Sequence, residues 1–111
     1  AQRGVQCCDH VFVLYEASTV ACVQDFVNTH HRKPYVLDIG CGTGLLSLQA
    51  ARAGAERVYG CEMFRSWAEV AKKNVTENGF DGVITIINKN SRDLVVKEDG
   101  ATEFGTRALF V

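Results

Sequence analysis

The chain has 111 residues, enough for one domain with a modest hydrophobic core. Its 12 basic and 13 acidic residues give a formal net charge of −1, which argues against a dedicated nucleic-acid-binding protein. No secretory signal and no apolar run of membrane-spanning length is visible, so we expect neither a membrane nor a nucleic-acid partner. Five cysteines without CxxC spacing indicate reduced thiols in the cytoplasm, with the nucleus as a second location.

The first predicted elements are a helix over residues 15–29 and a strand over residues 35–39. Valines recur at helical spacing in the first segment, and Pro34 ends any helix before it. Residues 1–34 are therefore expected to form an N-terminal helical segment.

Helices and strands then alternate along the chain. Apolar periodicity and glycine stops predict helices over residues 45–53 and 64–78, and strands over residues 58–61, 83–87 and 107–111. Strands that alternate with helices imply right-handed crossovers and a parallel sheet. The predicted class is α/β, the N-terminal half of a Rossmann-like doubly wound parallel sheet with strand order 3-2-1-4 and flanking helices.

The fourth predicted strand, over residues 107–111, has no helix after it to cover the sheet. A bare parallel edge invites pairing with another chain. Residues 35–111 are thus expected to be a Rossmann-like core truncated after the fourth strand, and this piece of a larger protein is expected to self-associate. In the helix over residues 64–78, Trp67 falls on the apolar face and is expected to pack in the core.

Three glycines alternate between the first predicted parallel strand and the next helix, at Gly40, Gly42 and Gly44. This is more glycine than a turn needs, and it lets a ligand approach the backbone closely. The dinucleotide fingerprint G-x-G-x-x-G fails because its third position falls at Leu45. Asp38, an anion just before the loop, suits a ligand that carries an ammonium group.

Glu62 directly follows the second of these strands. An acid at this place can accept hydrogen bonds from both hydroxyls of a ribose. The alternative is a solvated acid at the start of the next helix, where negative charge is favourable. Its spacing of 18 residues after Gly44 favours the ribose interpretation.

Cysteines and histidines offer two further candidate sites. Cys41 and Cys61 end adjacent predicted strands, and we interpret them as small buried side chains near a ligand, with a redox-sensitive pair as the alternative. His30 and His31 have no carboxylate or cysteine at ligand spacing, so no metal site is expected.

The sequences VLDIGCGTG, residues 36–44, and VYGCE, residues 58–62, resemble the cofactor loop and ribose-binding acid of class I S-adenosylmethionine-dependent methyltransferases. GTGLLS, residues 42–47, is similar more specifically to the protein arginine methyltransferases. INKNS, residues 87–91, resembles the monomethylating (type III) branch of that family.

The resemblance implies roles by position. The glycine loop would lie against the methionine moiety, with Asp38 orienting it and approaching the amino group. Glu62 would accept from the ribose hydroxyls, Met63 would pack on the adenine, and the Ser91 backbone amide would face the adenine ring. Arg92 stands where many relatives carry a glutamate. The implied cofactor-binding set is Asp38, Gly40, Cys41, Gly42, Gly44, Leu45, Glu62, Met63, Ser91 and Arg92.

The same resemblance implies the S-adenosylmethionine-binding portion of a protein arginine N-methyltransferase, an enzyme that methylates a guanidinium nitrogen and releases S-adenosylhomocysteine. Its partner would be an arginine-containing protein, and the parent would be a homodimer or pseudo-dimer. No catalytic residue is expected in this chain, because the family's paired-glutamate loop follows the fourth strand. A non-catalytic methyltransferase-like module and a nicotinamide-dinucleotide-binding fragment are the alternatives.

Overall fold

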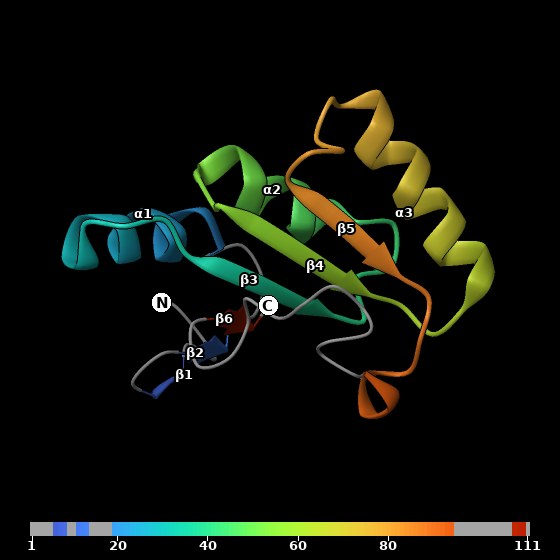
Figure 1. Ribbon diagram of the computed structural model, residues 1–111, viewed down its shortest axis with the longest axis horizontal. Coiled ribbons are helices and arrows are strands. Elements are labelled where there is room, and N and C mark those ends of the chain that lie inside the picture. The colour runs from blue at the N-terminus through green and yellow to red at the C-terminus, as the bar shows by residue number, and fades with distance from the viewer. Residues whose placement is uncertain (1–5, 9–10, 14–18, 95–107, 111) are drawn as a thin grey trace.

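The computed structural model describes residues 6–8, 11–13, 19–94 and 108–110. Its elements are, in chain order, β1 (Gln6–Cys8), β2 (Val11–Val13), α1 (Thr19–His30), β3 (Tyr35–Ile39), α2 (Leu45–Ala53), β4 (Arg57–Cys61), α3 (Arg65–Glu77), β5 (Ile84–Ile87), the 3-10 helix η2 (Ser91–Asp93) and β6 (Ala108–Phe110). Figure 1 shows how these elements are arranged.

All six strands join one sheet in the order β1-β2-β6-β3-β4-β5. β3 lies between β4 and β6, and β5 pairs with the far side of β4, all in parallel. β2 runs parallel to β6, and β1 is antiparallel to β2. The α/β class with a parallel sheet and flanking helices is confirmed.

The N-terminal part of the chain differs from expectation. The segment expected to be helical also contains β1 and β2, and the helix predicted over residues 15–29 is described only from Thr19. β2 pairs with β6, so the prediction that the fourth parallel strand is a bare edge is wrong, and β1 forms that edge instead. β1 and β2 have three residues each and were not predicted, because so short a segment shows little alternation of apolar and polar residues.

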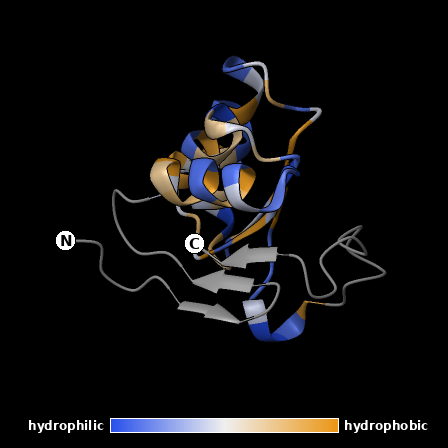
Figure 2. Ribbon diagram, turned by 90° about the vertical axis from the view of Figure 1, so that its left-hand side faces the viewer, coloured by the Kyte–Doolittle hydropathy of each residue, from blue (hydrophilic) through white to orange (hydrophobic). Residues whose placement is uncertain are grey.

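One hydrophobic cluster joins all three helices to the sheet. It combines buried side chains of α1, α2 and α3 with one face of β3, β4 and β5, and its largest members include Phe26, Leu48, Val58 and Ile84. Leu37, Tyr59 and Ile87 point to the opposite face, where Leu94 packs against them. The alternation follows from the two-residue period of a strand. Figure 2 shows the mixed hydropathy of the helices, which fits helices that bury one face only.

Helix α3 contacts the rest of the domain through small side chains. Ala68, Ala71 and Val75 are buried, whereas Trp67 is 51 % exposed. The expectation that Trp67 packs in the core is therefore wrong. A Cβ added at Gly44 would lie 3.5 Å from the Ala71 Cβ, within van der Waals contact, so the glycine loop lies directly against α3.

In the part of the chain that the structure describes, no helix combines the length and the apolar character that a membrane crossing requires.

Candidate functional site

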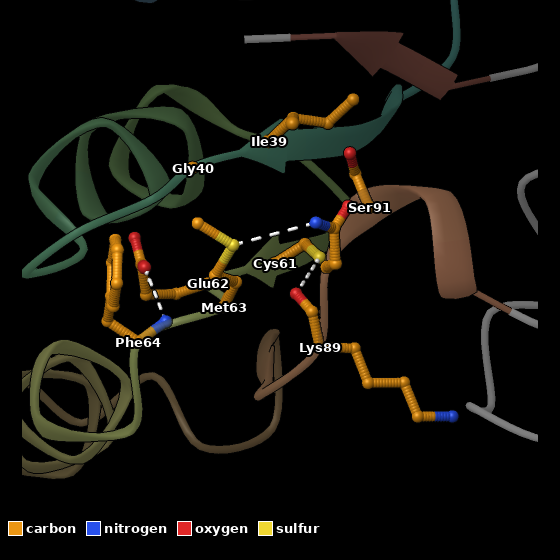
Figure 3. A pocket seen from close by; sticks show the side chains of 9 residues that line it. Ile39, Gly40, Cys61, Glu62, Met63, Phe64, Lys89 and Ser91 are labelled. Carbon is orange, nitrogen blue, oxygen red and sulfur yellow. Dashed lines mark hydrogen bonds between the residues drawn. The ribbon is translucent and has the colours of Figure 1, made fainter.

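A cavity of about 340 Å³ opens where β3, β4 and β5 end. Its lining consists of residues that end or closely follow these strands: Ile39, Gly40, Cys61, Glu62, Met63, Phe64, Lys89, Asn90 and Ser91. Figure 3 shows their side chains around the hollow. Ligands of open α/β sheets bind outside the carboxyl ends of the strands, and the volume is in the range of small-molecule sites.

The glycine loop runs from the end of β3 to the start of α2. Gly40, Gly42 and Gly44 have φ angles of 70°, 56° and 89°, all in the left-handed region that glycine adopts without strain. The loop follows this path because its three alternate residues carry no side chain to oppose it.

The loop directs most of its backbone N–H groups into the protein. Gly40 and Cys41 both donate to the Cys61 carbonyl, over 2.7 and 3.1 Å. Gly42 donates to Glu62 Oε1 over 3.0 Å, and Gly44 donates to the Cys41 carbonyl over 2.9 Å. These four amides therefore have protein acceptors and do not form an open nest for an anion.

Glu62 is at the centre of this arrangement. Its carboxylate is buried, with Oε1 accepting from Gly42 and Oε2 accepting from the Phe64 N–H over 2.8 Å (Figure 3). Glu62 is therefore not the solvated acid of the alternative interpretation, although it does accept from the residue that precedes α3. Each carboxylate oxygen can accept a further hydrogen bond from the cavity side.

Asp38 lies behind the loop and outside the cavity lining. It is 2 % exposed, and the Ser47 hydroxyl donates to its Oδ2 over 2.7 Å, aided by the Ser47 backbone N–H. Burial raises the pKa of Asp38 to about 6; the Ser47 bonds oppose this rise and the Glu62 charge adds to it. The side chain thus caps the first turn of α2 from the end of β3.

The cysteines near the loop are buried thiols, as expected. Burial raises the pKa of Cys41 to about 12, with the negative charges of Asp38 and Glu62 adding to the effect. Cys61 donates its S–H to the Lys89 carbonyl over 3.0 Å. Because the thiolate is the reactive form, these surroundings disfavour the redox alternative.

The structure brings four of the predicted site residues to the cavity wall: Gly40, Glu62, Met63 and Ser91. Asp38, Cys41, Gly42 and Gly44 support the loop from behind or within it. Leu45 is 60 % exposed at the start of α2. Arg92 is exposed, and its backbone N–H donates to Asn90 Oδ1 over 3.0 Å.

Four lining residues were not predicted from the sequence: Ile39, Phe64, Lys89 and Asn90, whereas Cys61 was expected near a ligand and lines the cavity. Their common signal is position, because each ends or closely follows one of the three neighbouring parallel strands. Asn90 donates to Met63 Sδ over 3.5 Å across the cavity (Figure 3). Within the described part of the chain, His, Cys, Asp and Glu side chains form no group of three that could hold a metal ion.

Comparisons with known proteins agree with this geometry. A family model described as "Ribosomal protein L11 methyltransferase (PrmA)" matches residues 16–102. The chain is 49 % identical over 74 residues to protein arginine N-methyltransferase 7 of Mus musculus, a match that covers 67 % of this chain. The chain spans 11 % of the length of that relative.

Two solved structures share the fold. Arabidopsis thaliana protein arginine methyltransferase 10 matches with a TM-score of 0.60 and 33 % identity, over 72 % of this chain and 22 % of that one. A Trypanosoma brucei PRMT1 enzyme–prozyme heterotetrameric complex with AdoHcy matches with a TM-score of 0.60 and 36 % identity, over 69 % of this chain and 23 % of that one. The chain therefore belongs to the class I S-adenosylmethionine-dependent methyltransferases, in the family of the ribosomal protein L11 methyltransferase (PrmA) model.

Proposed function

We propose that the cavity at the ends of β3, β4 and β5 binds S-adenosylmethionine, and that the chain is the cofactor-binding portion of a protein arginine N-methyltransferase. The observation that carries the proposal is the buried carboxylate of Glu62, which lines the cavity and also bonds Gly42 of the glycine loop. One acid thereby joins a ribose-binding position to the loop that would contact the rest of the ligand.

The charge around the loop favours this ligand over a dinucleotide. A dinucleotide places its pyrophosphate at free amides and at the N-terminus of the following helix. Here the amides of Gly40 and Gly42 already have protein acceptors. The Asp38 carboxylate lies at the first turn of α2, where it accepts a hydrogen bond from Ser47. Two carboxyl groups beside the loop repel a pyrophosphate but attract the ammonium and sulfonium charges of S-adenosylmethionine.

The lining residues fit the parts of the ligand in order. Gly40 presents backbone to the methionine moiety, and Glu62 accepts from the ribose hydroxyls. Met63 packs against the adenine, opposite the Ser91 backbone. Asp38 acts through the loop, because it is buried behind it.

When bound, S-adenosylmethionine supplies an electrophilic methyl group on its sulfonium. The residues described here hold and orient that ligand, which is the positioning part of an in-line methyl transfer. The similarity to enzymes named protein arginine N-methyltransferase supports a protein arginine as acceptor. A second copy or a pseudo-symmetric half as partner is the expectation from the family resemblance. Buried free thiols at Cys22, Cys41 and Cys61 suit the cytoplasm or the nucleus.

Calorimetric titration of the chain with S-adenosylhomocysteine and, separately, with NAD tests the ligand. We expect heat from the first ligand and none from the second. Glu62→Gln should weaken S-adenosylhomocysteine binding roughly ten- to 100-fold, since it removes charge-assisted hydrogen bonds. The exposed acid Glu56 provides the matched control, Glu56→Gln, which should bind as the unsubstituted chain does. Binding of NAD alone, or an unaffected Glu62→Gln variant, contradicts the proposal.

The acceptor is tested with the full protein that contains this chain. Transfer of a labelled methyl group to an arginine peptide, and none to the same peptide with lysine in place of arginine, is the expected result. Binding of S-adenosylhomocysteine without transfer to arginine would instead support the non-catalytic module.

A further inference from the structure

Two asparagine side chains hold the walls of the candidate site without lining the cavity. Asn74 projects from α3 and donates through Nδ2 to the Thr43 carbonyl of the glycine loop, over 2.9 Å. Asn88 follows β5 and donates through Nδ2 to two successive carbonyls, those of Glu62 over 2.9 Å and Met63 over 3.1 Å. Each contact joins segments that are more than twenty residues apart in the sequence.

The contact of Asn74 addresses a physical problem of the glycine loop. Glycine has more backbone freedom than any other residue, so a loop with three of them loses much entropy when a ligand fixes it. Asn74 holds the loop at Thr43, and one turn earlier on α3 Ala71 packs against Gly44. These neighbouring contacts seat the loop on the helix before any ligand arrives, which reduces the ordering required on binding.

The contact of Asn88 fixes the turn that carries the nucleoside-binding residues. The Glu62 backbone N–H donates to the Ile87 carbonyl over 2.9 Å, and the Asn88 side chain returns two bonds to the same turn. The backbone is thus held on both sides of the point where the Glu62 and Met63 side chains enter the cavity. A turn held in this way presents the ribose acid and the adenine contact in one orientation.

We propose that Asn74 and Asn88 are positioning residues for the two halves of the ligand. Asn74 sets the glycine loop beside the amino-acid half, and Asn88 sets the Glu62–Met63 turn beside the nucleoside half. The inference rests on the proposed binding of S-adenosylmethionine. Glu62 links the two halves through Gly42, but each asparagine supports its own side.

Two ligands separate these roles: S-adenosylhomocysteine, and 5′-methylthioadenosine, which lacks the amino-acid group. Asn74→Ala should weaken the first about fivefold and leave the second unchanged, because one hydrogen bond to the loop is lost. Asn88→Ala should weaken both ligands equally, by about 25-fold, because two hydrogen bonds to the nucleoside turn are lost. The ratio of the two dissociation constants therefore changes in the first variant only.

The control is Asn78→Ala, which removes another asparagine of the same helix end. Asn78 bonds Arg52 and the Asn74 carbonyl, so its loss should lower thermal stability yet leave both affinities unchanged. If an alanine variant does not fold, Asn74→Leu or Asn88→Leu takes its place, since leucine has the same number of side-chain heavy atoms, branched at the same carbon, without the amide.

The outcomes distinguish the two levels of the proposal. An unsubstituted chain that does not bind S-adenosylhomocysteine overturns the proposed function itself. If it binds, and Asn74→Ala weakens both ligands alike or neither, Asn74 is not a positioning residue of the amino-acid half. If Asn88→Ala changes the ratio of the two constants, or neither constant, the assignment of Asn88 to the nucleoside half is wrong.

Discussion

Replacing Asp38 with asparagine changes how the stability of the chain depends on pH. Asp38 is almost fully buried, and its pKa is raised from 3.8 to about 6. A carboxyl group with a raised pKa in the folded state holds its proton where the unfolded chain has lost it. Its contribution to stability is therefore complete below pH 3.8 and is lost as the pH rises through about 6.

The size of this loss follows from the shift. A rise of this extent corresponds to about 3 kcal/mol of unfolding free energy between the two ends of the window. The asparagine side chain of the variant does not titrate but retains an oxygen that accepts from Ser47. We therefore compare the unfolding free energy of Asp38→Asn with that of the unsubstituted chain at each pH. The value for the variant minus the value for the unsubstituted chain should increase by about 3 kcal/mol between pH 3.5 and pH 7.

Urea unfolding followed by far-ultraviolet circular dichroism measures this difference at each pH. Subtraction removes the titration of all other acids, because both proteins carry them. If the difference in unfolding free energy stays constant from pH 3.5 to pH 7, or changes with the opposite sign, the pKa of Asp38 is not raised in the folded state.

Three further substitutions test other contacts. Gly60→Ala places a methyl group 2.8 Å from Ile86 Cδ1 and 3.0 Å from Cys41 Sγ, so the unfolding free energy should fall by roughly 1–3 kcal/mol. Adding Cys41→Ala should restore part of this loss, because it removes the Sγ contact. An unchanged unfolding free energy in Gly60→Ala would contradict the close packing. Ser47→Ala removes the hydroxyl bond to Asp38, so the pKa of that carboxyl should rise further. In the same urea experiment, the pH range over which Asp38 lowers the stability should move upward. An unchanged pH range would show that the bond is not formed. Trp67→Gln should lower the unfolding free energy by less than about 1.5 kcal/mol because the ring is half exposed. A loss of about 3 kcal/mol or more would show that the ring is buried in the core.

Local signals were sufficient for the central elements of the fold. Helix α2 spans the predicted residues because glycines border it on both sides, and Gly54 at its end has a φ of 111° and donates to two helix carbonyls. The cavity acid Glu62 was predicted from its place after β4. The bounds of α2 depend on residues close in sequence. The place of Glu62 depends on the spacing between the first two parallel strands, which the fold class imposes.

Long-range contacts account for what the sequence did not reveal. β2 is a strand because β6 lies beside it, and its three residues carry no period of their own. Trp67 shares the apolar stripe of α3 with Ala71, but only the packing of the helix in the folded domain shows that Ala71 is buried and Trp67 is half exposed. The amide of Asn88 meets the turn after β4, 26 and 25 residues away, and no local pattern indicates such a pairing.

A crystal structure of the chain with S-adenosylhomocysteine tests the central claim most directly. The account predicts both ribose hydroxyls within about 2.6–3.0 Å of the Glu62 carboxylate, the adenine between Met63 and Ser91, and the amino-acid group at the glycine loop. A ligand bound elsewhere, or in the cavity with Glu62 bonded only to Gly42 and Phe64, would contradict it.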